Sequence, residues 1–153
     1  MATSPLRPVE VSHHIPAEPP EVLAFVSDTR NDPTWCPNVT EVSQLAGDGV
    51  GLGSRFRFHQ SVKTGGRTLD SEVDVEVVGL TEDSVRWRVE DRFQIRDVTL
   101  TVEPDGAGTK VRQETLATFK KDPGLARWLY PFLARRTFRE QFSRLAEHFS
   151  SPD

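Results

Sequence analysis

The sequence lacks most of the residues that mark secreted and membrane proteins. It contains one cysteine, Cys36, so no disulfide can form within the chain. A chain without disulfides is typical of a reducing compartment, and we expect a cytoplasmic protein. No apolar run suits a signal peptide, and none approaches the roughly 20 residues that a membrane span needs. The sequence therefore predicts no stable membrane insertion.

A basic excess and a metal-ligand cluster are also lacking. The formal net charge is -4, whereas phosphate recognition usually requires a positive surface, so we do not expect a nucleic-acid partner. His13 and His14 are adjacent on a predicted strand and point to opposite faces, and His59 and His148 stand apart, so no metal site is predicted. No glycine-rich phosphate loop joins a strand to a helix, and no cofactor is implied.

What the chain does contain is an ordered series of hydrophobic patterns. Residues 1–8 are small, polar and proline-bearing, and we expect a flexible tail there. Residues 9–149 have a length suited to a single domain. A strand is predicted over Val9–Ile15, followed by two short helices. The first begins at Pro20, and the second begins with Asp32 as its N-terminal cap.

Alternating apolar and polar residues dominate the middle of the chain. The pattern is clearest where Asp70, Glu72, Asp74 and Glu76 occupy one face and Leu69 begins the apolar face. A Gly65-Gly66 pair predicts a tight hairpin turn. Further strands are predicted over residues 39–45, 55–63, 69–77, 84–91, 94–102 and 109–119.

A long amphipathic helix is predicted from Gly124 to Phe149, with Pro131 kinking its start. Its apolar residues recur at steps of three and four and should be buried together. They are Leu125, Trp128, Leu129, Phe132, Phe138, Phe142, Leu145 and Phe149. The predicted fold class is therefore α+β: a curved antiparallel sheet of about seven strands around a long C-terminal helix, with two short helices after the first strand.

This element order resembles the helix-grip fold of the START-like (SRPBCC) superfamily. Four local segments are similar to those of the family: Trp35–Val39, Gly51–Phe56, Leu100–Val111 and Leu129–Arg136. The superfamily includes polyketide cyclases and dehydratases, lipid-transfer domains and birch-pollen-allergen-like proteins. The resemblance covers nearly the whole chain and implies a fold, but that fold carries enzymes, carriers and regulators alike.

If the sheet curls around the last helix, its inward residues should line a ligand cavity. Arg96 is the sharpest candidate, because a buried guanidinium is costly without a partner and could bind a carboxylate or polarise a carbonyl. The alternative is a bulge near Phe93 that turns Arg96 to solvent or to an acidic neighbour. No catalytic residue is assigned, and Cys36 has no evident histidine partner. The candidate ligand-binding residues are Trp35, Phe58, Gln60, Ser71, Trp87, Arg96, Gln113, Thr115, Phe138 and Phe142.

Three functional hypotheses remain open. The first is binding of a hydrophobic or aromatic small molecule, lipid or polyketide-like, between the sheet and the C-terminal helix. The second is a polyketide cyclase or dehydratase-type enzyme acting on a ligand in the same cavity. The third is a protein-interaction module with a filled cavity. The aromatic start of the last helix could gate the cavity, form a homodimer or touch a membrane, and we favour gating or core packing.

Overall fold

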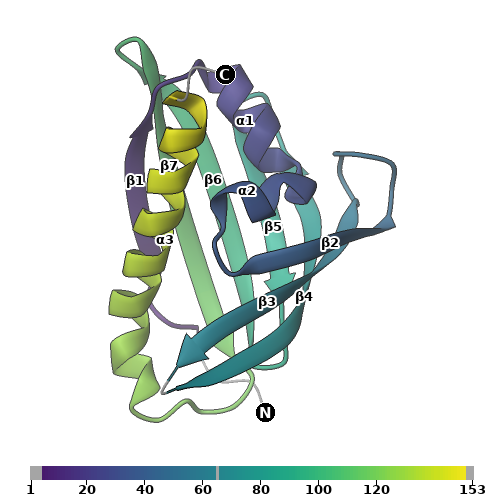
Figure 1. The fold of residues 1–153 in the computed structure, drawn as a ribbon, viewed down its shortest axis with the longest axis vertical. Coiled ribbons are helices and arrows are strands. Elements are labelled where there is room, and N and C mark those ends of the chain that lie inside the picture. Colours follow the sequence, from purple (N-terminus) through teal and green to yellow (C-terminus); the bar gives the residue numbers. More distant parts are fainter. Residues whose placement is uncertain (1–4, 65, 151–153) are drawn as a thin grey trace.

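The computed structural model describes residues 5–64 and 66–150, in which one antiparallel sheet has the strand order β1-β7-β6-β5-β4-β3-β2. The first strand therefore pairs with the last one, with Val9 opposite Thr115. This pairing places the first and last strands side by side at one edge of the sheet (Figure 1). The strands are β1 Val9–Ile15, β2 Val39–Ala46, β3 Arg55–Thr64, β4 Arg67–Leu80, β5 Ser84–Glu90, β6 Gln94–Asp105 and β7 Gly108–Phe119.

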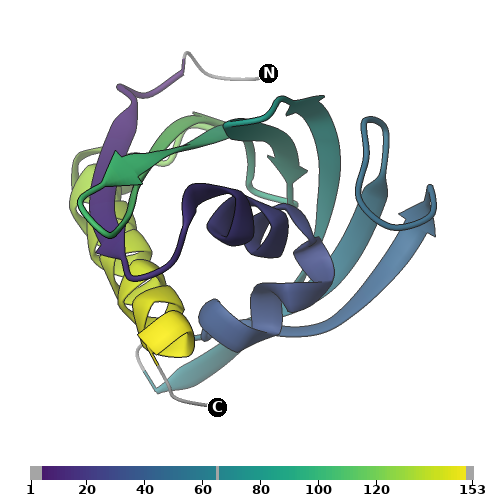
Figure 2. The ribbon, with the colours of Figure 1, turned by 90° about the horizontal axis from the view of Figure 1, so that it is seen from above.

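The sheet is strongly curved, and helices occupy its concave side (Figure 2). The two short helices are α1 Pro19–Ser27 and α2 Asp32–Trp35, joined by the 3-10 turn η1 Thr29–Asn31. The long helix α3, Ala126–Ser150, packs against β1 and α2. The predicted α+β class and element order are confirmed.

The core forms because the inward face of each strand is apolar and α3 adds one apolar stripe. Alternate residues of β4 and β5, such as Val73, Val75, Val85 and Trp87, are buried. From α3 the buried residues are Ala134, Phe138, Phe142 and Leu145, spaced by three and four positions. At the N-terminal end, Leu6 is also buried and its amide donates to the Ala117 carbonyl at 2.9 Å, so this part of the expected tail is held against β7.

The first turns of α3 do not follow the sequence prediction. Leu125, Trp128, Leu129 and Phe132 were expected in the buried stripe, but each side chain is more than half exposed. They occupy a different face of the helix from the residues that reach the core, because the apolar spacing is broken between Phe132 and Phe138. Tyr130, which packs edge-on against Phe119, takes the inward position instead.

Two smaller expectations also need correction, and two others fall partly outside the described residues. Leu69 is 44% exposed, since the beginning of β4 extends beyond the helices that cover the sheet. Asp32 is the first residue of α2 and makes no capping hydrogen bond; the cap position belongs to Asn31. In the predicted Gly65-Gly66 turn, Gly65 lies outside the described residues, and Gly66 has a φ of 78°. Residues 1–4 of the expected tail also lie outside them.

The two faces of α3 should differ sharply in their contribution to stability. Replacing Phe142, which is fully buried, by Ala should lower the free energy of unfolding by about 3–5 kcal/mol. The matched change Phe132→Ala, at a side chain 68% exposed, should alter it by no more than about 0.5 kcal/mol. Urea unfolding followed by circular dichroism measures both, and equal losses would contradict the helix orientation described above.

Candidate functional site

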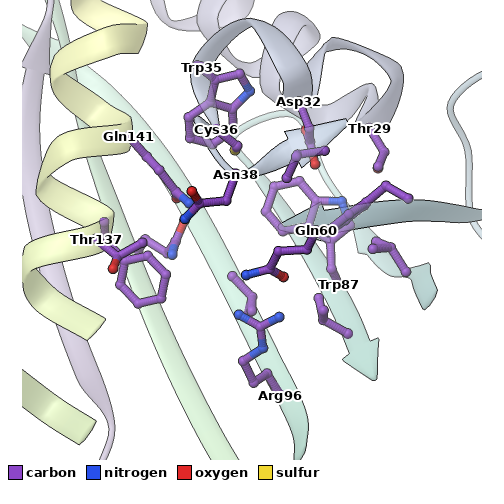
Figure 3. A pocket seen from close by; sticks show the side chains of 17 residues that line it. Thr29, Asp32, Trp35, Cys36, Asn38, Gln60, Trp87, Arg96, Thr137 and Gln141 are labelled. Carbon is purple, nitrogen blue, oxygen red and sulfur yellow. The ribbon is translucent and has the colours of Figure 1, made fainter. Parts of the chain in front are cut away.

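A cavity of about 130 Å³ lies between the concave face of the sheet, α2 and α3. Its walls combine apolar and aromatic side chains with polar ones, and eight of the seventeen lining residues are polar or charged (Figure 3). This combination is common in small-molecule sites. The lining residues are Thr29, Asp32, Trp35, Cys36, Asn38, Val39, Phe58, Gln60, Val75, Trp87, Val89, Arg96, Val98, Gln113, Thr137, Phe138 and Gln141.

The structure brings seven of the ten predicted site residues together around this cavity. They are Trp35, Phe58, Gln60, Trp87, Arg96, Gln113 and Phe138. The other three lie elsewhere. Ser71 borders a surface depression with His59 and Arg92. Thr115 is fully buried beside Gln113, whose Nε2 lies 3.4 Å from the Thr115 hydroxyl. Phe142 stacks behind Trp35, with ring centroids 6.0 Å apart, and so supports the wall.

Arg96 faces the cavity from β6. The pairing of β6 with β5 and β7 runs past Arg96 without a register shift, with Val89 and Ala117 opposite it. The bulge near Phe93 that would have turned Arg96 to solvent is therefore absent. Within residues 5–64 and 66–150 the guanidinium has no ion pair, and its Nε is buried without a hydrogen-bond partner. An unpaired cation in an apolar cavity favours an anionic or strongly polar ligand group.

Asp32 adds a carboxyl group to the same cavity from the first residue of α2. Its side chain makes no hydrogen bond or ion pair with another described residue. Burial raises the pKa of this carboxyl well above its usual value, and the negative charge of Asp28 raises it further. Asp32 thus resists ionisation and keeps its proton to a higher pH than an exposed carboxyl does.

The Cys36 thiol lies next to these groups but is not an activated nucleophile. Burial raises its pKa well above the usual value; the Asp32 charge adds to this effect and the Arg96 charge opposes it. A thiolate is the reactive form of cysteine, and this environment disfavours it. Among the described residues, no histidine lines the cavity.

Two indole groups also contribute hydrogen-bond donors without acceptors. The Nε1 atoms of Trp35 and Trp87 are buried and have no partner among the described residues, as is true of the Arg96 Nε. Buried polar atoms in folded proteins are normally paired. Three unpaired N–H donors on residues that line one cavity favour a ligand that presents hydrogen-bond acceptors.

Several lining residues escaped the sequence analysis. Thr137 and Gln141 flank Phe138 on the inward side of α3, and Gln141 extends toward the same part of the cavity as Asn38 (Figure 3). The sequence feature that could have identified Thr137 and Gln141 is their spacing of four residues, next to the buried stripe of the same helix. Asp32 was interpreted as a helix cap, which is the commoner role of an Asp that precedes a proline at a helix start. Asn38 lies in a connection with no periodic pattern.

Comparison with known proteins agrees with this architecture. Residues 7–150 match the sequence profile of the polyketide cyclase / dehydrase and lipid transport family. The chain belongs to this family. Membership implies, in broad terms, the binding of a hydrophobic ligand, and it confirms the START-like (SRPBCC) resemblance. No curated protein sequence matches the chain.

Solved structures of similar shape support the helix-grip fold. The KanY protein has a TM-score of 0.71 and 23% identity, covering 95% of this chain and 99% of its own. A START superfamily protein from Mycobacterium smegmatis has a TM-score of 0.73 and 18% identity, with 93% and 96% covered. Ara h 8.0201 has a TM-score of 0.71 and 15% identity, with 97% and 100% covered. At such identities the likeness shows the shared fold alone.

The raised pKa of Asp32 makes a definite prediction for stability. When the folded-state pKa exceeds the unfolded value, the folded protein binds the proton more tightly. Stability is then lost as pH rises from the unfolded pKa to the folded one, by about 1.4 kcal/mol for each pH unit between them. Asp32→Asn should remove this loss. The unfolding free energy of the variant relative to wild type should increase with pH above about 4 and then level off.

Urea titrations at a series of pH values measure this difference. Asp83→Asn is the matched control, since Asp83 is exposed on the turn before β5. A difference between Asp32→Asn and wild type that does not change with pH would show that Asp32 ionises normally.

Proposed function

We propose that this protein binds an apolar, aromatic or polyketide-like small molecule whose oxygen atoms accept hydrogen bonds from Arg96 in the cavity. The observation that carries the proposal is the unpaired Arg96 guanidinium in a cavity with apolar walls. Family membership supports a hydrophobic ligand, and Arg96 adds a preference for a carboxylate, phenolate or carbonyl oxygen.

The size of the cavity limits what the observed conformation accepts. A volume of about 130 Å³ is close to the roughly 150 Å³ of an engineered cavity that holds benzene. It is smaller than the roughly 300 Å³ at which drug-sized sites begin. One aromatic ring therefore fits inside the cavity as observed, and a larger ligand has to extend beyond it or displace part of its wall.

Charge-matched probes test the role of Arg96. Benzoate and 2-naphthoate should bind more tightly than the neutral alcohols with the same ring systems. Arg96→Met should weaken the two carboxylates at least tenfold, because a hydrogen bond to a charged group contributes about 1.5–3 kcal/mol. Isothermal titration calorimetry measures the affinities.

The alcohols provide an internal control, because Arg96→Met should leave their affinities nearly unchanged. Arg86→Met is the matched variant, since Arg86 lies on the neighbouring strand, is exposed and pairs with Asp97 at 3.4 Å. Equal loss of carboxylates and alcohols in Arg96→Met would show that Arg96 supports the wall rather than recognising an anion.

A second candidate function is catalysis of dehydration in the same cavity. One observation favours it: Asp32 and Arg96 both line the cavity, and neither has an ion-pair partner among the described residues. In a β-hydroxyketone, the Asp32 carboxylate would take the α-proton while Arg96 stabilises the enolate oxygen. The enolate then expels the β-hydroxide, which takes the proton from Asp32 and leaves as water. A carboxyl of raised pKa is suited to both transfers.

The loss of water from 4-hydroxy-4-phenylbutan-2-one, followed by ultraviolet absorbance, tests this second candidate. The rate should rise with pH as Asp32 ionises, and Asp32→Asn should lower kcat by at least about a hundredfold. Binding of 2-naphthoate should persist in Asp32→Asn, which separates loss of chemistry from loss of the site. No acceleration by the wild-type protein would leave ligand binding as the only function supported.

A further inference from the structure

An apolar stripe faces solvent along the first turns of α3. It consists of Leu125, on the turn just before the helix, and of Trp128, Leu129, Phe132 and Leu133, which are 83%, 79%, 58%, 68% and 51% exposed. At about 100° per residue the four helical positions share one face of the helix. The buried residues Ala134, Phe138, Phe142 and Leu145 fall on nearly the opposite face. We call the exposed set the outward stripe.

The outward stripe differs from the other exposed apolar residues of the protein. Leu45, Leu52 and Phe93, for example, lie singly on separate strands or loops. Scattered apolar residues are normal on a protein surface, whereas contiguous ones mark a site of interaction. The two aromatic and three leucine side chains of the outward stripe are adjacent, so they form a contiguous apolar surface.

The charges around the outward stripe are cationic. Residues 120–140 contain six Lys or Arg and two acidic residues, a formal charge of +4 in a chain whose net charge is -4. Of these cations, Lys120 is paired with Glu90 at 2.8 Å. Arg136 and Arg139 continue the same helix face and are exposed. In the part of the chain that the structure describes, neither they nor Lys121 and Arg127 form an ion pair. These cations are available to an external anionic partner.

We propose that the outward stripe docks on an anionic lipid surface, with α3 lying along the interface. Trp, Phe and Leu on one helix face, bordered by Arg and Lys, match the requirements of a helix that rests at the boundary between headgroups and acyl chains. A second copy of the chain is the poorer fit, because two such surfaces would bring like charges together. No helix within residues 5–64 and 66–150 has the length and hydropathy to cross a bilayer, so docking is at the surface.

The surroundings of Trp128 supply a place for a headgroup. Arg7 and Arg127 line a depression together with Trp128, Pro131 and the segment around Leu6. The hydrogen bond from Leu6 to Ala117 holds that segment beside the helix. Two guanidinium groups next to an exposed indole suit a lipid phosphate at the depth where tryptophan prefers to lie.

Vesicle binding tests the proposal with the intact protein. Co-sedimentation with phosphatidylcholine vesicles containing phosphatidylglycerol should exceed that with pure phosphatidylcholine, and it should fall as salt is added. Tryptophan fluorescence should shift to the blue on binding. Trp35 and Trp87 are only 4% and 7% exposed, so the shift reports Trp128, and Trp128→Phe should abolish it while retaining most of the binding.

Paired variants separate the apolar and electrostatic contributions. Trp128→Ser with Phe132→Ser should reduce partitioning more than tenfold; Leu52→Ser, at a residue 68% exposed on the loop after β2, is the apolar control. Arg136→Gln and Arg139→Gln should each reduce partitioning about fivefold, from about 1 kcal/mol per cation near an anionic membrane. Arg86→Gln on β5 is the charge control.

Two results would overturn the proposal. One is equal sedimentation with charged and neutral vesicles, or sedimentation that survives the double Ser variant. The other is a wild-type protein that does not bind vesicles but forms a concentration-dependent dimer in light scattering. In that case Trp128→Ser would dissociate the dimer. That second result would assign the outward stripe to another copy of the chain. Because these substitutions lie away from the cavity, 2-naphthoate affinity should be unchanged in all of them.

Discussion

The interior depends on one geometric constraint: a single helix must close a curved sheet of seven strands. From α3 only Ala134, Phe138, Phe142 and Leu145 are fully turned toward the sheet, and they cover the side near β1. The other half of the concave face is covered by α1 and the one-turn helix α2. Four side chains and two short helices do not fill the width between β1 and β3. A cavity therefore remains between the sheet, α2 and α3.

This incomplete filling determines the chemistry of the cavity. Where packing is complete, as around Phe56 and Leu100, the inward residues are apolar and fully buried. Polar residues occur where the helices stand away from the sheet, and Arg96 and Asp32 are the charged examples. A buried charge without a partner destabilises the fold, so such residues are conspicuous. Gln60, Arg96 and Gln113 of the sheet border the cavity, where a ligand could reach them. Other buried polar residues, such as Thr109 and Thr115, lie outside it.

The strands were the most predictable part of the structure, because alternation gives every residue a face once one face is known. Val85, Trp87 and Val89 were placed inward in this way, and all three are buried. Helical spacing was less informative, since it shows that residues share a face but not which way that face points. Trp128 and Phe132 satisfy the same pattern as Phe138 and Phe142. Asp32 shows a further limit: its proximity to Arg96 across the cavity depends on contacts between segments some sixty residues apart in the sequence.

The two faces of α3 connect the cavity with the surface. Phe138, Thr137 and Gln141 form one wall of the cavity, and the outward stripe begins a few turns earlier on the other side of the same helix. Pro131 lies within the span of the outward stripe, between Leu129 and Phe132, and removes a backbone donor, which weakens the helical hydrogen-bond ladder at that point. A force on the outward stripe is thus applied next to the weakest turn of the element that closes the cavity. A bilayer that takes up Trp128 and Phe132 would therefore contact the same helix whose opposite face forms part of the cavity wall.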